Sequence, residues 1–295
     1  MIAAARARLG VLGGSGLYDI DGLAGRSVVD VETPFGSPSA PVICGRFGEV
    51  TIAFLSRHGQ GHRLLPTEIN FRANVYALKS LGVEFILSAS AVGSLREEID
   101  PLDIVVPDQF VDRTRHRADT FFGRGLVAHV SLADPVCARL AALTADAVRE
   151  AGADVHRGGT YVCMEGPQFS TRAESELYRT WGAHVIGMTN LQEARLAREA
   201  EICYASLALV TDYDCWKTDE EPVTVDAVIE RIRLNAERAK VTVTRLAEVL
   251  PETRSCQCAR ALDSAIITRR DTIPAETVRR LGPIVERVLG GRPEA

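Results

Sequence analysis

The feature that most constrains the fold is an alternation of apolar, β-branched runs with helical patterns. Seven runs are expected as strands: residues 8–14, 50–59, 84–93, 103–112, 159–166, 183–190 and 202–212. Helical patterns occupy residues 71–82, 134–152, 172–182, 191–201, 225–250 and 274–289. Several strand runs are apolar throughout, which indicates burial on both faces. The order predicts an α/β fold, a single domain whose central mixed, largely parallel β-sheet is flanked by helices.

The length of 295 residues suits one large α/β domain, and the sequence contains no internal repeat or linker. We expect a main body over residues 1–250. Residues 251–295 are expected as a C-terminal helical extension packed on the same domain. The polar stretch from about Leu250 to Cys258 joins the two parts.

Bulk composition excludes several classes of partner. The net charge of −5 gives no support to nucleic-acid binding, although a small anion needs only a local pocket. No apolar run approaches the roughly 20 residues that cross a bilayer. The first residues lack the pattern of a secretory signal, and the seven cysteines suit reduced thiols, so we expect a cytoplasmic protein.

The pair Cys256 and Cys258 stands in a polar stretch with C-x-C spacing. Two cysteines without a nearby histidine make a poor zinc site, so no metal is expected.

Polar or glycine-rich segments follow most of the predicted strands. They are GGSG, SRHGQGH, SASAVGSL, MEGPQF, GMTN and TDYD. In open α/β sheets, ligands bind beyond the carboxyl ends of the strands. The sequence therefore predicts one pocket lined by six strand endings.

Two of these segments are candidates for anion binding. In SRHGQGH, Arg57 offers a planar fork that suits phosphate oxygens, and His58 and His62 stand four residues apart. A solvated surface loop is the alternative. In GGSG, backbone N–H groups and the Ser15 hydroxyl could surround an anion, but an ordinary turn explains that stretch equally well.

The segment TDYDCW carries the most specific signal. In an extended chain Asp212 and Asp214 point to the same face, and mutual repulsion raises one carboxyl pKa. A neutral carboxylic acid donates to a ring nitrogen and a carboxylate accepts from an amine, a combination that fits an aminopurine. The alternative is capping of a following helix by solvated acids.

Taken together, ordered motifs from about Gly10 to Ala239 resemble those of the methylthioadenosine phosphorylases, within the trimeric purine nucleoside phosphorylase family. They include GVLGGSGLYD, ETPFGSPS, SRHGQGH, INFRANVYALKSLG, EGPQFSTRAESELYRTWGAHVIGMTN and EAEICYASLALVTDYDCW. The resemblance implies a nucleoside phosphorylase domain over residues 1–250 and a pentosyltransferase of purine and methionine salvage. Its reaction would be phosphorolysis of S-methyl-5'-thioadenosine to adenine and 5-methylthioribose 1-phosphate. Inorganic phosphate is then a co-substrate, and no cofactor is needed.

The same resemblance implies roles for individual residues. The phosphate pocket would comprise Ser15, Arg57, His58, Ser90, Ala91 and Thr189. The nucleoside would contact Met188, Phe169, Asp212, Asp214, His62, His129, Val228 and Ile232. Asp212 and Asp214 are the catalytic candidates, with Asp212 protonating N7 of the purine. His129 would come from the adjacent subunit, which implies a homotrimer, or a hexamer built as a dimer of trimers.

Other activities remain open. A nucleoside phosphorylase that prefers adenosine, a 5'-deoxy- or 5'-halo-adenosine, or inosine or guanosine is the nearest alternative. Hydrolysis is disfavoured by the predicted anion site. A dinucleotide-dependent oxidoreductase is disfavoured because the fingerprint G-x-G-x-x-G is missing. Some relatives bridge a C-x-C pair, but a reducing cytoplasm disfavours a disulfide between Cys256 and Cys258.

Overall fold

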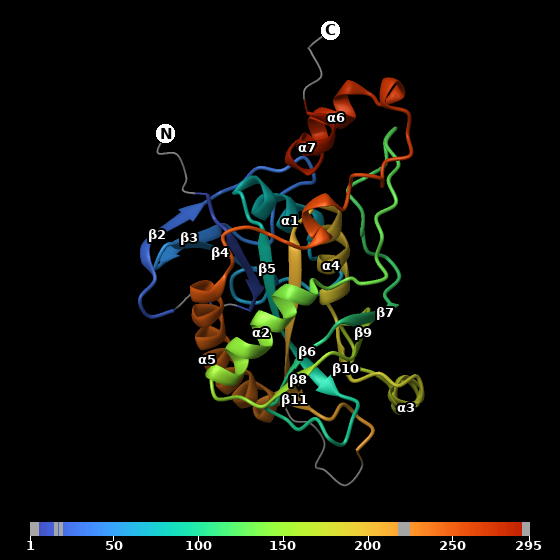
Figure 1. Ribbon diagram of the computed structural model, residues 1–295. Helices are drawn as coiled ribbons and strands as arrows, with labels where there is room; N and C mark the ends of the chain where they lie inside the picture. The colour runs from blue at the N-terminus through green and yellow to red at the C-terminus, as the bar shows by residue number, and fades with distance from the viewer. Residues whose placement is uncertain (1–5, 15–16, 18–19, 218–224, 291–295) are drawn as a thin grey trace.

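One mixed sheet organises the protein, whose computed structural model describes residues 6–14, 17, 20–217 and 225–290, without the side chains of 225–229 and 232. Its strands are β1 (Leu9–Gly13), β2 (Ala24–Val29), β3 (Val42–Phe47), β4 (Val50–Ser56), β5 (Phe85–Ser94), β6 (Ile104–Val106), β7 (Gln109–Arg113), β8 (Val155–Arg157), β9 (Thr160–Met164), β10 (Val185–Gly187) and β11 (Cys203–Asp212). The described strands form one eleven-stranded sheet (Figure 1). Its main path runs β2-β3-β4-β1-β5-β10-β9-β7, and β11, β6 and β8 branch from β5.

The helices flank this sheet. They are α1 (Phe71–Ser80), α2 (Ala138–Glu150), α3 (Arg172–Thr180), α4 (Asn190–Glu199), α5 (Val225–Val249), α6 (Ala275–Leu281) and α7 (Glu286–Leu289). α2 packs against α5 and both contact β11, while α1 packs against α4 (Figure 1). The predicted fold, a single α/β domain around a mixed, largely parallel sheet, is confirmed.

The centre of the sheet is parallel, and its strands are buried on both faces. β1 lies between β4 and β5, and β11 pairs with the other side of β5, all in parallel. Every residue of β1 is buried, and so is every residue of β11 before its last. Both faces of these strands are therefore covered, as the continuous apolar runs predicted.

The sheet reverses direction at β10. Val185 and Ile186 pair antiparallel with Ser94 and Gly93, the last residues of β5, and β9 and β7 continue in the direction of β10. Since β10 overlaps only the end of β5, its own carboxyl end remains close to that of β5. Strands that run in opposite directions thus finish in one region.

Three strands were not predicted from the sequence, and two predicted elements are interrupted in the structure. β2 is mostly exposed, and β2, β3 and β8 lack the long apolar runs that identified the other strands. Pro107, which has no N–H to donate, separates β6 from β7 within the run 103–112. The predicted helix 274–289 is interrupted at Gly282 and Pro283, between α6 and α7. No described helix has both the length and the apolar character needed to span a membrane.

The C-terminal segment packs on the core through a buried carboxylate. Glu201 follows α4 and is almost fully buried. Its carboxylate accepts hydrogen bonds from the Leu262 N–H at 2.9 Å and from Arg287 Nε at 2.7 Å. Its own carbonyl accepts from Arg254 at 2.5 Å. The side chain and the backbone carbonyl of Glu201 therefore tie together three parts of the segment after residue 250.

We expect Glu201→Ala to lower the free energy of unfolding by about 1.5–3 kcal/mol, because charge-assisted hydrogen bonds from Arg287 and Leu262 are lost. Urea unfolding at matched protein concentration measures the change. The control is Glu230→Ala, which removes an exposed pair with Arg233 and should change stability by less than about 0.5 kcal/mol. Equal effects of the two substitutions would contradict the anchoring role of Glu201.

Candidate active site

A cavity of about 540 Å³ lies at the carboxyl ends of β4, β5, β10 and β11. Ten of the predicted site residues line it: Arg57, His58, His62, Ser90, Ala91, Phe169, Met188, Thr189, Asp212 and Asp214. Arg57 and Asp212, the predicted anion site and the predicted acid, therefore open onto the same cavity.

The remaining predicted residues lie elsewhere. Ser15 is outside the described residues, and so are the side chains of Val228 and Ile232 on α5. One turn further along that helix, Asn235 and Ala236 line the cavity. His129 is exposed and does not line the cavity of its own chain; its N–H donates to the Ala265 carbonyl at 2.8 Å.

The Arg57 guanidinium is buried beneath the cavity. Nε donates to Glu193 at 2.5 Å, Nη2 to the Ser88 hydroxyl at 2.6 Å, and Nη1 to the Ala89 carbonyl at 3.0 Å. Glu193 also accepts from Ser88 and from the Tyr204 hydroxyl. Glu193 thus balances the positive charge of Arg57. One Nη1 hydrogen has no acceptor among the described residues.

His58 is a neutral imidazole at physiological pH. Burial, followed by the neighbouring Arg57 charge, lowers its pKa to about 4. Its Nδ1 lies 2.8 Å from the Leu64 carbonyl. Because a carbonyl only accepts, Nδ1 carries the hydrogen and Nε2 is left bare. The ring of His62 stacks on that of His58 with centroids 4.2 Å apart.

Hydroxyl groups gather around one buried amide. The Asn190 Oδ1 lies 2.9 Å from the Ser90 hydroxyl, 3.1 Å from that of Thr189 and 3.2 Å from that of Tyr161. An amide oxygen has two lone pairs, so these three donors compete for it. A hydroxyl hydrogen can therefore turn to another acceptor in the cavity.

Helix α4 adds a second source of donors at this point. Thr189 is its N-cap residue, lines the cavity and makes no side-chain cap. The N-terminus of a helix presents unpaired N–H groups and a partial positive charge, which together favour an anion.

The acid pair has a different local structure from the expected one. β11 ends at Asp212 with a bulge after Val210, which sets Asp212 opposite Gly93 of β5, and Asp214 stands in the following turn with φ of 53°. The expectation of a continuous extended segment was therefore wrong. Both carboxyl groups face the cavity nevertheless, because the Asp214 N–H donates to Asp212 at 2.8 Å and closes the turn.

The two acids differ in their surroundings. Asp212 accepts from the Asp214 N–H and from the Thr211 hydroxyl at 2.6 Å, so each of its two oxygens has a donor. Burial, and further the negative charge of Asp212, raise the pKa of Asp214. The raised pKa therefore favours Asp214 as the proton donor, where the sequence alone favoured Asp212.

Small residues leave room beside the acids. A Cβ on Gly93 would lie 3.1 Å from the Asp212 Oδ1 and 3.2 Å from the Asp214 Cβ. Ala91 is exposed at the cavity wall. Larger side chains at these positions on β5 would occupy the space between the acids and the hydroxyl cluster.

Arg117 organises the cavity although sequence reasoning missed it. Its nearly buried guanidinium donates to the carbonyls of Met188, Met164 and Glu165, and to Gln192 at 3.0 Å. It thereby holds the ends of β9 and β10 together. Only its place within a long irregular segment hints at this role, because its partners, most of them backbone carbonyls, are far away in the sequence.

Of two further parts of the cavity lining, one was predicted from the sequence and the other was not. Phe169 lines the cavity but is 78% exposed, so it lies at the entrance. Leu64, Leu65 and Pro66 follow the predicted anion loop and give the cavity an apolar side that was also missed. Their position directly after SRHGQGH is the signal that could have identified them.

Comparisons with known proteins identify the family of the chain. Residues 8–248 match the family model of the phosphorylase superfamily. The S-methyl-5'-thioadenosine phosphorylase of Koribacter versatilis is 55% identical over 285 residues, 97% of this chain and 98% of the relative. That of Geobacter sulfurreducens is 58% identical over 278 residues, 94% and 97% of the two chains. A crystal structure of a methylthioadenosine phosphorylase from an antarctic soil metagenomic library is 48% identical, with a TM-score of 0.91 over 95% of this chain and 99% of that one. The chain therefore belongs to the phosphorylase superfamily.

Proposed function

We propose that the protein is an S-methyl-5'-thioadenosine phosphorylase, a pentosyltransferase that produces adenine and 5-methylthioribose 1-phosphate from the nucleoside and phosphate. The observation that carries this proposal is a single cavity with anion donors on one side and an acid pair on the other. The relatives that are more than 50% identical over nearly the whole chain bear that enzyme name. Phosphate attacks the anomeric carbon as the purine leaves, and the protein supplies positioning and electrostatic stabilisation.

At the purine end, the two acids perform different tasks. Asp214, whose pKa is raised by burial and by Asp212, donates its proton toward N7, so that adenine leaves without a negative charge. Asp212 accepts a hydrogen bond from the exocyclic amine. A 6-oxopurine places an acceptor where Asp212 needs a donor, which favours adenine over hypoxanthine and guanine.

At the other end, hydrogen-bond donors and one shared proton hold the phosphate. Ser90, Thr189 and the N-terminus of α4 donate hydrogen bonds, and Arg57 contributes one Nη1 hydrogen. The bare Nε2 of His58 accepts from a protonated phosphate oxygen, or takes that proton and donates. Because Glu193 already balances Arg57, the site binds phosphate through hydrogen bonds more than through net charge.

The apolar side chains around the cavity support a 5'-methylthio group over a 5'-hydroxyl. The side chains of Leu64, Leu65 and Pro66 offer no partner for a hydroxyl, whose burial without a hydrogen bond is unfavourable. We propose that Val228 and Ile232 also contribute to the apolar surroundings of the 5'-methylthio group.

The proposal also includes the oligomeric state of the enzyme and its location in the cell. His129 is exposed and does not line the cavity of its own chain, so we assign it to the site of an adjacent subunit in a homotrimer. We further place the enzyme in the cytoplasm, where its seven cysteines, none of which forms a disulfide, remain reduced.

The direct test is adenine release from S-methyl-5'-thioadenosine with and without inorganic phosphate. We expect release that depends on phosphate, formation of 5-methylthioribose 1-phosphate detected by ³¹P NMR, and a lower kcat/KM for adenosine and inosine. Equal rates without phosphate would show a nucleosidase instead. A preference for inosine would contradict the role of the acid pair.

The assignment of the acid is tested by two conservative variants. Asp214→Asn should lower kcat by about 10²–10⁴-fold, because an amide cannot protonate N7. Asp212→Asn should mainly raise KM for the nucleoside. Steady-state kinetics measures both, and Asp146→Asn, at an exposed position on α2, serves as the control. If Asp212→Asn has the larger effect on kcat, the acid is Asp212.

The lowered pKa of His58 predicts how phosphate binding depends on pH. In the complex, His58 and phosphate together carry one proton more than neutral His58 and the phosphate dianion carry when they are separate. Above the second pKa of phosphate, KM for phosphate should therefore rise with pH, by up to about tenfold per unit, while KM for the nucleoside does not follow it. His58→Gln, which does not titrate, should alter this dependence. A KM for phosphate that stays constant between about pH 7 and pH 9 would rule out the shared proton.

A further inference from the structure

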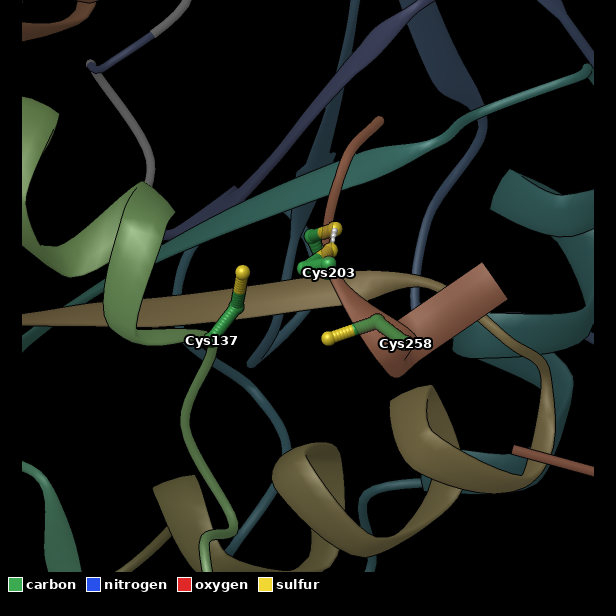
Figure 2. A group of neighbouring side chains, drawn as sticks. Cys137, Cys203 and Cys258 are labelled. Carbon is green, nitrogen blue, oxygen red and sulfur yellow. Dashed lines mark hydrogen bonds between the residues drawn. The ribbon is translucent and has the colours of Figure 1, made fainter. Parts of the chain in front are cut away.

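Four cysteine thiols from three separate segments meet at the opposite end of β11 from the cavity. Cys137 is the N-cap residue of α2, and Cys203 is the first residue of β11. Cys256 and Cys258 belong to the C-terminal segment, around the 3-10 helix η1 (Gln257–Arg260). All four Sγ atoms lie within 4.8 Å of one another. Figure 2 shows the side chains of Cys137, Cys203 and Cys258 converging from α2, β11 and η1.

The spacing of the thiols fits a single central ion. Four sulfur ligands placed tetrahedrally at about 2.3 Å from zinc lie about 3.8 Å from one another. The Sγ atoms of Cys203 and Cys256 are 3.3 Å apart, which is beyond the length of about 2.05 Å for a covalent sulfur–sulfur bond. A disulfide needs one close pair, whereas here every thiol is close to the other three.

The surroundings also suit metal ligands. Cys137, Cys203 and Cys258 are buried, and Cys256 is half-buried. Cys137 and Cys256 occupy N-cap positions, yet neither makes a side-chain cap, so their sulfur atoms are available to the cluster. Arg139 donates to the hydroxyl of Ser255 at 2.6 Å and brings a positive charge beside the cluster, whose four thiolates and one divalent ion would carry a net charge of −2.

We propose that Cys137, Cys203, Cys256 and Cys258 bind one zinc ion as a structural tetrathiolate site. Binding releases the four thiol protons to solvent and forms four Zn–S bonds, with no change of oxidation state. The ion would join the C-terminal segment to α2 and to β11.

The site is structural rather than catalytic. Cys203 and Asp212 stand at opposite ends of β11, nine residues apart, which corresponds to about 30 Å along an extended strand. A metal bound by the cysteines therefore cannot contact the substrate. The C-x-C pair was expected to bind no metal because the sequence does not show the two further thiols that the fold brings beside it.

The first test is the metal content of the full-length protein. Protein produced with zinc in the medium and purified under reducing conditions without chelator should carry about one zinc per chain, measured by native mass spectrometry and elemental analysis. Cys256→Ser, at the least buried ligand, should lose most of the zinc. Cys44→Ser, which removes a buried thiol outside the cluster, should retain it. Wild-type protein without zinc, or Cys44→Ser that loses it equally, would overturn the proposal.

A second test keeps the proposal falsifiable if Cys256→Ser fails to fold. Wild-type apoprotein prepared with a chelator should melt at a lower temperature, and added Zn²⁺ should restore the melting temperature. Co²⁺ in place of zinc should give the intense absorption bands of a tetrahedral thiolate site. Protein whose intact mass reveals two disulfides among the four cysteines, with no bound metal, would overturn the proposal in favour of oxidative pairing.

Discussion

The buried ion pair between Arg57 and Glu193 is the interaction on which the site depends. Arg57 follows β4, while Glu193 lies in the first turn of α4, and the guanidinium also binds the Ser88 hydroxyl and the Ala89 carbonyl of β5. The pair therefore fixes two strands and a helix relative to one another. Removing either partner would leave an uncompensated charge in the core, which is strongly unfavourable. His58 is the next residue along the chain, and its neutrality follows partly from the charge of Arg57.

The reversal of the sheet at β10 then completes the cavity. If the sheet were parallel throughout, the carboxyl end of β5 would meet only strands of its own direction. The antiparallel overlap with Val185 and Ile186 brings Met188 and Thr189 to that end instead. Arg117 binds the backbone at the ends of β9 and β10 and holds them there. The proposed phosphate and purine sites thus come from two sets of strands joined at a single point.

Strand β11 connects the two sites of the molecule. Its carboxyl end carries Asp212, where a bulge and the Asp214 turn direct both acids into the cavity. Its amino end carries Cys203, where the C-terminal segment returns to the sheet. Glu201, two residues before Cys203, binds the same segment through Leu262 and Arg287. The segment after residue 250 is thus secured at the end of β11 remote from the proposed chemistry.

The sequence by itself determined the strands of the sheet centre, the principal helices and most of the residues that line the cavity. These features are local: apolar runs such as 84–93 and 202–212 specify burial, and polar residues after a strand lie at its carboxyl end. The tertiary structure alone decided that Glu193 neutralises Arg57, that Asp214 is the acid with the raised pKa, and that Cys137 and Cys203 join the C-x-C pair. Hydrogen bonds, burial and charge between residues far apart in the chain create these properties, and no local pattern records them.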